Sequence, residues 1–256
     1  MKLGMVIPNP LAPSLAEAPR AAEAGAKGLL ARPEVFVDSA FALKVGPDEM
    51  AAALRELPLV GLWPRSSLLG PDGVAQMQSC IDLADALREF APPDTMPLVV
   101  CDAGGGDRET AWPRLVEALQ GLARAAEERS CILAVRPDRA SIVDRSRSAA
   151  KLLAEVGSSY VQTAVDPAAT VGDKDTLDDA VLRLKDNIVL AFARDVKFDQ
   201  TGKPTYLPPG SGVLSYAKYA ELLAGAGACG YLVLGELATI DELKAAASRV
   251  RSHIGA

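Results

Sequence analysis

Charged side chains directly follow most of the short apolar runs in this sequence, and they are the residues best suited to chemistry. Arginine is frequent at these positions, and a guanidinium group there would suit a carboxylate or phosphate on a small ligand. The carboxylates would either act as acid and base or pair with the arginines. Taken singly, each charge is equally consistent with a solvated loop start. The residues concerned are Arg32, Arg65, Asp102, Arg136, Asp138, Asp166, Arg194, Asp195 and Glu236, together with Trp63.

Eight apolar runs predict the elements that must position these side chains. The runs start about 33 residues apart on average, which is the length of one strand–helix unit. Most are continuously apolar, as parallel strands covered on both faces are. The predicted fold is therefore α/β: a single (β/α)8 TIM barrel over residues 1–256, whose strand ends meet at one mouth. The predicted strands are Leu3–Ile7, Lys27–Ala31, Leu59–Trp63, Leu98–Cys101, Cys131–Val135, Tyr160–Val165, Ile188–Ala193 and Tyr231–Leu234.

Capping patterns predict where several helices between the strands begin. A Ser or Thr followed three residues later by an acidic residue is typical of a helix start. Such pairs occur at Ser14 and Glu17, Ser141 and Asp144, Thr176 and Asp179, and Thr239 and Glu242, while Thr110 is a predicted cap with Pro113 in the first turn.

The segment after the seventh strand, residues 194–214, is predicted to be a long loop without internal structure. Loops of this length are uncommon and often functional. It contains Lys197, a candidate ligand-binding residue, and Gly210-Ser211-Gly212, whose spacing matches no established phosphate-binding motif.

Composition excludes several classes of function. The chain carries 27 Lys and Arg against 33 Asp and Glu, a net charge of −6, which disfavours a nucleic-acid partner. A single histidine, His253, excludes sites that need two imidazole ligands from one chain. We expect no signal peptide and no membrane helix, because no apolar run is long enough. The four cysteines, Cys80, Cys101, Cys131 and Cys229, have no CxxC spacing, so we expect reduced thiols and a cytoplasmic location.

Four motifs, in order along the chain, resemble a known family. They are Val165-Asp166-Pro167-Ala168-Ala169, the run from Ile188 to Asp195, Pro209-Gly210-Ser211-Gly212-Val213-Leu214-Ser215-Tyr216, and Gly230-Tyr231-Leu232-Val233-Leu234. Together they resemble the xylose-isomerase-like TIM barrels, the sugar phosphate isomerase/epimerase group that also includes apurinic-site endonucleases. The resemblance spans essentially the whole chain and implies a carbohydrate isomerase or epimerase, whose divalent metal polarises a carbonyl.

Most of the metal ligands that this resemblance implies are replaced. The strand-five Glu of the family corresponds to Arg136, whereas the strand-six Asp is kept as Asp166. We therefore expect a degenerate metal site in which Arg136 takes the place of the metal and pairs with Asp166, because neighbouring strands are about 4.8 Å apart. The remaining family ligands fall on Ala169, on Leu190 or Phe192, and on Gly235, next to Glu236.

Two functions follow as hypotheses. One is a metal-independent isomerase or epimerase, without cofactor, acting on a small anionic carbohydrate or sugar acid; the other is a catalytically inactive barrel that binds a ligand or a protein partner. An apurinic endonuclease is the least consistent with the composition, because it needs several metals and a basic groove. The sequence leaves a homo-oligomer open. The predicted catalytic residues are Asp166, Arg136 and Glu236, and the predicted substrate-binding residues are Arg65, Asp102, Arg194, Asp195, Trp63 and Lys197.

Overall fold

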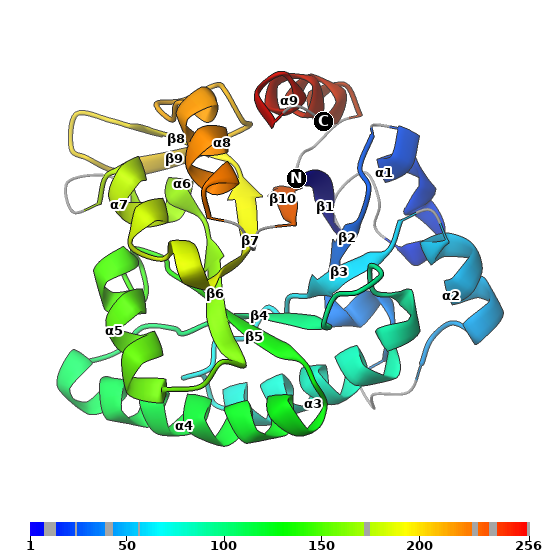
Figure 1. The fold of residues 1–256 in the computed structure, drawn as a ribbon, viewed down its shortest axis with the longest axis horizontal. Coiled ribbons are helices and arrows are strands. Elements are labelled where there is room, and N and C mark those ends of the chain that lie inside the picture. The colour runs from blue at the N-terminus through cyan, green and yellow to red at the C-terminus, as the bar shows by residue number, and fades with distance from the viewer. Residues whose placement is uncertain are drawn as a thin grey trace.

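Eight parallel strands close into a barrel in the order β1-β10-β7-β6-β5-β4-β3-β2 (Figure 1). The computed structural model describes residues 1–7, 14–23, 25–38, 43–55, 57–171, 175–226, 230–235 and 240–254. The barrel confirms the predicted (β/α)8 fold, and every predicted strand overlaps an observed one. The strands are β1 (Lys2–Ile7), β2 (Leu29–Ala31), β3 (Leu59–Leu62), β4 (Leu98–Asp102), β5 (Ile132–Arg136), β6 (Val161–Val165), β7 (Ile188–Ala193) and β10 (Tyr231–Leu234).

Helices surround the barrel as an outer layer (Figure 1). They are α1 (Pro19–Glu23), α2 (Pro47–Leu54), α3 (Gly73–Ala86), α4 (Arg108–Glu128), α5 (Ser146–Val156), α6 (Pro167–Thr170), α7 (Leu177–Leu182), α8 (Tyr216–Ala224) and α9 (Ile240–Ile254), and short 3-10 turns lie at Leu15–Glu17, Pro33–Val35, Arg88–Phe90 and Lys185–Asn187. Within the described residues, no helix is both long enough and apolar enough to cross a membrane.

Two of the predicted helix starts are confirmed. The Glu17 carboxylate accepts from the backbone N–H of Ser14 at the start of a 3-10 turn, and the Thr176 hydroxyl accepts from the N–H of Asp179 at the start of α7. The start at Thr239 lies outside the described residues.

Two other predicted starts are wrong by a few residues. Helix α4 is capped by Asp107, whose carboxylate accepts from the Thr110 N–H, so Thr110 is already inside the helix. Helix α5 begins at Ser146, because Ser141 instead closes a local turn in which its hydroxyl accepts from the Val143 N–H.

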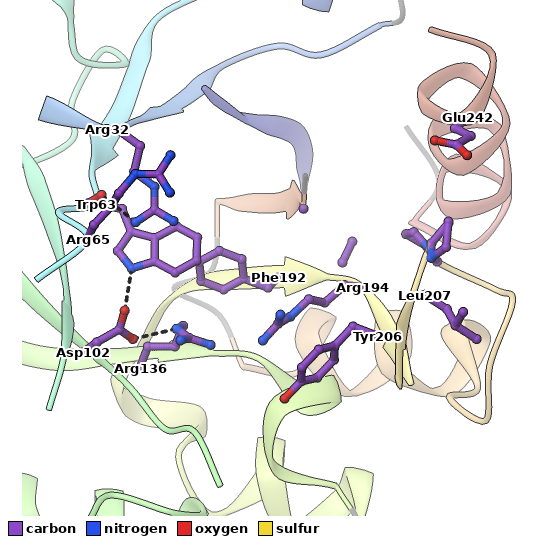
Figure 2. A pocket seen from close by; sticks show the side chains of 14 residues that line it. Arg32, Trp63, Arg65, Asp102, Arg136, Phe192, Arg194, Tyr206, Leu207 and Glu242 are labelled. Atoms are coloured by element: carbon purple, nitrogen blue, oxygen red, sulfur yellow. Dashed lines mark hydrogen bonds and ion pairs between the residues drawn. The ribbon is translucent and has the colours of Figure 1, made fainter. Parts of the chain in front are cut away.

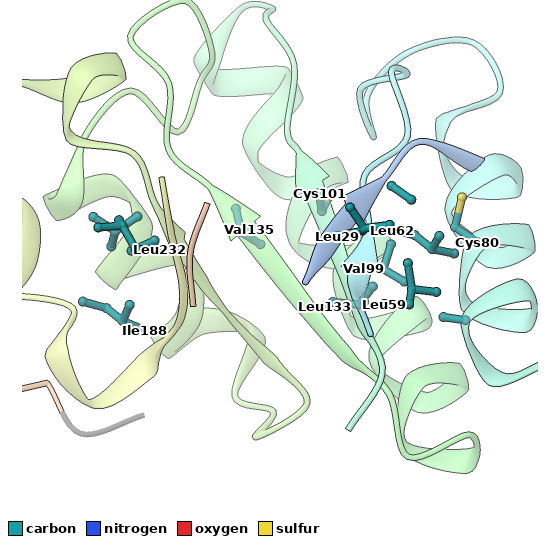
Figure 3. Close-up of a cluster of buried hydrophobic side chains, with 14 of the residues drawn as sticks. Leu29, Leu59, Leu62, Cys80, Val99, Cys101, Leu133, Val135, Ile188 and Leu232 are labelled. Carbon is teal, nitrogen blue, oxygen red and sulfur yellow. The ribbon is translucent and has the colours of Figure 1, made fainter. Parts of the chain in front are cut away.

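The apolar core has two parts, one on each face of the strands. The larger part lies between the strands and the helices, where Leu29, Leu62 and Cys80 are among the buried side chains (Figure 3). The smaller part fills the barrel interior, as expected of a packed barrel rather than a pore. Its buried members are Val6, Leu30, Val60, Leu98, Val100, Ile132, Ala134, Ala164, Leu190, Phe192, Tyr231 and Val233.

The segment after β7 is structured, which corrects the expectation of an irregular loop. It forms an antiparallel hairpin of β8 (Asp195–Phe198) and β9 (Pro204–Leu207). The Gly210-Ser211-Gly212 run helps to hold this segment, because the Gly212 N–H donates to the Asp195 carboxylate at 2.9 Å. A Cβ at Gly212 would lie 2.3 Å from the Val196 carbonyl oxygen, so only glycine fits there.

Candidate functional site

A cavity of about 670 Å³ opens at the C-terminal ends of the barrel strands (Figure 2). This is the end of a (β/α)8 barrel at which active sites form. Its lining residues come from the ends of six strands, the hairpin and α9; they are Arg32, Trp63, Arg65, Asp102, Arg136, Phe192, Ala193, Arg194, Tyr206, Leu207, Pro208, Pro209, Gly235 and Glu242.

The charged layer of this cavity rests on the apolar barrel interior because side chains alternate along each strand. Residues two apart point to the same face of a strand. Arg136 on β5 therefore follows the interior residue Ala134, and Asp102 on β4 follows Val100. Asp102 and Arg136 are register partners on the neighbouring strands β4 and β5.

Arg136 is surrounded by carboxylates. Its Nε donates to Asp102 Oδ1 at 2.8 Å, and its Nη1 donates to Asp138 Oδ2 at 3.1 Å and to Asp166 Oδ2 at 3.0 Å. The predicted Arg136–Asp166 pair is therefore present. Burial acts to lower the pKa of Arg136, but the carboxylates of Asp102, Asp166 and Asp138 outweigh it, so the pKa lies above its ordinary value. The guanidinium is a fixed positive charge.

Asp166 is shared between two arginines. Its Oδ2 also accepts from Arg194 Nε at 2.7 Å, and Arg194 Nη2 lies 2.5 Å from the same oxygen. The Asp166 side chain is fully buried and does not line the cavity, and its Oδ1 has no hydrogen-bond partner among the described residues. This carboxylate therefore holds Arg136 and Arg194 side by side from below the cavity floor.

An aromatic group forms one wall of the cavity. The Trp63 Nε1 donates to Asp102 Oδ2 at 2.9 Å, and the guanidinium carbon of Arg32 lies 3.8 Å from the centre of the Trp63 ring. The Phe192 ring packs against the indole with centroids 5.0 Å apart. Across the cavity, the Tyr206 ring lies 4.2 Å from the guanidinium carbon of Arg194 (Figure 2).

Four of the predicted binding residues line this cavity, namely Trp63, Arg65, Asp102 and Arg194, and so does Arg136. Arg65 lies at the rim, where its Nε contacts Glu34 Oε1 at 3.0 Å and 62% of its side chain is exposed. The geometry brings together residues that are separated by more than one hundred positions in the sequence.

Asp195 and Lys197 lie elsewhere, which corrects the expectation that they line the pocket. Asp195 directly follows the inward-facing Arg194 and points to the opposite face, where it is fully buried. Its carboxylate accepts from the backbone N–H groups of Val196, Gly212 and Leu214, so it holds the loop after the hairpin. Lys197 is exposed on β8 and is not a lining residue. Glu236 lies outside the described residues.

Three further residues contribute charge or aromatic surface to the cavity. Arg32, which directly follows a predicted strand, is among the strand-end charges but has no predicted binding role, and Tyr206 and Glu242 are not predicted site residues. Tyr206 has no usable signal in the sequence, because its position depends on the hairpin, and Glu242 comes from the last helix.

Comparison with known proteins identifies the family. The model of the family described as xylose isomerase-like TIM barrel matches residues 19–253, so the chain belongs to this family. None of the curated protein sequences matches it.

Solved structures of similar fold include several sugar epimerases. The chain is similar to 3-keto-D-glucoside 4-epimerase YcjR from E. coli, with a TM-score of 0.78 and 17% identity over 98% of this chain and 99% of that one. D-psicose 3-epimerase from Clostridium cellulolyticum H10, solved with D-tagatose, gives 0.77 and 15% over 99% of each chain. The IolI protein, solved with a zinc atom, gives 0.75 and 16% over 99% of each. Identities this low show the shared fold alone.

The residues present do not fit the divalent metal that the family resemblance implies. The resemblance places the strand-five ligand at Arg136, whose Nη1 already lies 3.0 Å from Asp166 Oδ2, so a cation bound to Asp166 would face a guanidinium at close range. The same resemblance places two further ligands at Phe192 and Gly235. In the part of the chain that the structure describes, no group of three or more His, Cys, Asp or Glu side chains could hold a metal ion.

Proposed function

We propose that the mouth cavity binds a small carbohydrate that carries a carboxylate or another anionic group. The observation that supports this is that two arginine nitrogens donate no hydrogen bond to the described residues. Asp102, Asp138 and Asp166 each accept from Arg136, whereas Arg136 Nη2 and Arg194 Nη1 donate to no described residue. Both arginines line the cavity. A ligand rich in acceptors, such as a sugar acid, would complete their hydrogen bonds.

The walls of the cavity support a carbohydrate as the body of this ligand. Trp63, Phe192 and Tyr206 give it aromatic surface between charged groups. The face of an aromatic ring suits the C–H groups of a sugar ring, and the charged groups beside it suit the O–H groups.

The family membership favours isomerisation or epimerisation, and the guanidinium of Arg136 beside Asp166 favours a form of this reaction without a metal. In this scheme Arg136 polarises a substrate carbonyl and stabilises the enediolate oxygen that forms when a proton leaves the adjacent carbon. A guanidinium held by three carboxylates is oriented before the substrate arrives, which is the arrangement that stabilises developing negative charge. Asp166 and Glu236 are the proposed proton carriers.

Binding without turnover is the second candidate, and the position of Asp166 favours it. A general base must come within hydrogen-bond reach of the proton it removes. Asp166 is fully buried beneath Arg136 and Arg194 and does not line the cavity. The described lining residues include no histidine that could replace it.

Isothermal titration with D-glucuronate and D-glucose tests the binding proposal. The two sugars differ only in the carboxylate, so we expect D-glucuronate to bind at least about tenfold more tightly. Arg194→Gln should remove most of this preference, whereas Arg124→Gln, at the exposed opposite end of the barrel, should keep it. Equal binding of both sugars would refute the anionic specificity.

Hydrogen exchange in D2O separates the two candidates. Turnover through an enediolate replaces the proton on the carbon next to the carbonyl with deuterium, which proton NMR detects. Exchange that persists after chelator treatment and disappears in Asp166→Asn supports the metal-independent enzyme. Ligand binding without exchange supports the inactive barrel.

A further inference from the structure

A second cavity, of about 470 Å³, lies beside the mouth cavity. We call it the side cavity. Its walls come from the segments that follow β2 and β3 and from one side of α3, and they include Pro33, Val37, Pro64, Ser66, Gln76 and Cys80. It has no part in the binding scheme above.

Arg65 joins the two cavities, because its side chain lines both. The backbone is continuous between them as well: Pro64 directly follows Trp63, and Pro33 directly follows Arg32. The Arg65 side chain is 62% exposed and is held by one ion pair, to Glu34 at 3.0 Å. An exposed pair of this kind stabilises a position by at most about 1 kcal/mol, so Arg65 moves at little cost.

The chemistry of the side cavity differs from that of the mouth. Pro33, Val37 and Pro64 present apolar surface. The Cys80 thiol is uncharged, because burial in the first place, and then the nearby Glu34 and Cys131, raise its pKa to about 12. The side cavity therefore combines an apolar wall with charged lining residues, Glu34, Asp38, Lys44 and Arg65, which suits an apolar ring that carries a polar substituent.

We propose that the side cavity binds an apolar group, such as an aryl aglycone, attached to the sugar that occupies the mouth. The ligand class would then include glycosides of a sugar acid as well as free sugar acids, with Arg65 at the junction. Because a glycoside has no free carbonyl at its anomeric carbon, such a ligand belongs with binding without turnover, the second candidate above. This inference rests on the proposed function, since the sugar acid itself must bind in the mouth.

Titration with D-glucuronate and with both anomers of 4-nitrophenyl D-glucuronide tests the proposal. One anomer should bind at least about tenfold more tightly than free D-glucuronate, because its ring leaves water for an apolar cavity. If D-glucuronate binds and neither glucuronide binds more tightly, the side cavity is not an aglycone site and the proposed function stands. If no ligand binds, the proposed function and this inference both fail.

A variant on α3 locates the added affinity. Gln76 is exposed at the edge of the side cavity, so Gln76→Trp should fill it without disturbing the fold. We expect Gln76→Trp to abolish the tenfold preference and leave D-glucuronate binding unchanged. Gln78→Trp is the matched control, because Gln78 lies on the same helix but lines a different cavity. A glucuronide preference that survives Gln76→Trp would overturn the assignment.

Discussion

The barrel interior and the mouth cavity are built on the same strands but have opposite chemistry. Along β5, the interior residues Ile132 and Ala134 are apolar, and Arg136, two residues further on, is charged. Strand β7 repeats the pattern, since Leu190 and Phe192 precede Arg194. On the inward faces of β5 and β7, charge therefore occurs only at the last position, which is Arg136 on β5 and Arg194 at the end of β7.

The difference shows how a barrel separates stability from binding. In the interior layers, apolar side chains fill the space and leave water no room. At the mouth layer, burial of the Arg136 and Arg194 charges is tolerated because each of these guanidinium groups meets a carboxylate from an adjacent strand end, as Arg136 meets Asp102 and Asp166. Substitutions in the mouth layer should affect both stability and ligand binding, whereas those in the interior should affect stability alone.

Arg136→Met should have the largest effect. It removes the charge that faces three carboxylates, one of them fully buried, and breaking a buried ion pair costs about 3–5 kcal/mol. We expect the free energy of unfolding to fall by this amount in urea denaturation, with loss of D-glucuronate binding. The exposed Arg124→Met should change stability by less than about 0.5 kcal/mol. A mild effect of Arg136→Met would show that the carboxylates do not depend on this guanidinium.

Leu190→Ala should lower stability by about 3 kcal/mol, because it leaves a cavity in the packed interior. Binding of D-glucuronate, followed by calorimetry in the same buffer, should stay within about twofold of wild type. A large loss of affinity would mean that the interior layer also shapes the site, which would break the contrast between the two regions.

Trp63→Phe keeps an aromatic wall but removes the indole donor to Asp102. A hydrogen bond to a charged group contributes about 1.5 kcal/mol or more, so both stability and ligand affinity should fall by roughly that amount. The control is Trp112→Phe, which removes a similar bond from Nε1 to Glu155 far from the mouth. This control should lower stability without changing affinity, and equal affinity losses in the two variants would count against the role of Trp63.

The smallest effect concerns pH. Burial raises the pKa of Cys80 from 9.0 to about 12, and mainly burial does the same for Cys131. Above pH 9 the unfolded chain loses these protons while the folded chain keeps them, so stability falls as the pH rises from 9 to 12. Each thiol should contribute a loss of about 1 kcal/mol between pH 8 and pH 10.

Urea denaturation at a series of pH values measures this loss, and Cys80→Ala should reduce it. Ligand affinity should not follow the same curve, because the nearby carboxylates raise the pKa of Arg136 and Arg194 against the effect of burial and keep both charged. A parallel fall in affinity would connect the thiols to the site.

The fold and part of the site could be predicted from the sequence. Continuous apolar runs located all eight barrel strands, and the strand ends located Trp63, Asp102, Arg136 and Arg194 in the cavity. Adjacent strands also predicted the Arg136–Asp166 pair, because parallel strand ends at one mouth bring such residues within reach.

One error was avoidable, because strand alternation would have turned Asp195 away from the mouth, since its neighbour Arg194 faces inward. The remainder depended on information that local patterns do not carry. Tyr206 reaches Arg194 through a hairpin without a distinctive turn signal, and the burial of Asp166 beneath two guanidinium groups follows from packing. Each of these is a tertiary effect.

Metal binding by the unliganded protein tests the central claim, that the Arg136 guanidinium stands where the family resemblance places a metal. Protein stripped with chelator is dialysed against Mn²⁺ or Zn²⁺ and its metal content measured, with Asp166→Asn as the control for binding elsewhere. We predict no stoichiometric metal in either protein and an unfolding midpoint that chelator does not change. One equivalent of metal in the wild type that is lost in Asp166→Asn would contradict the claim.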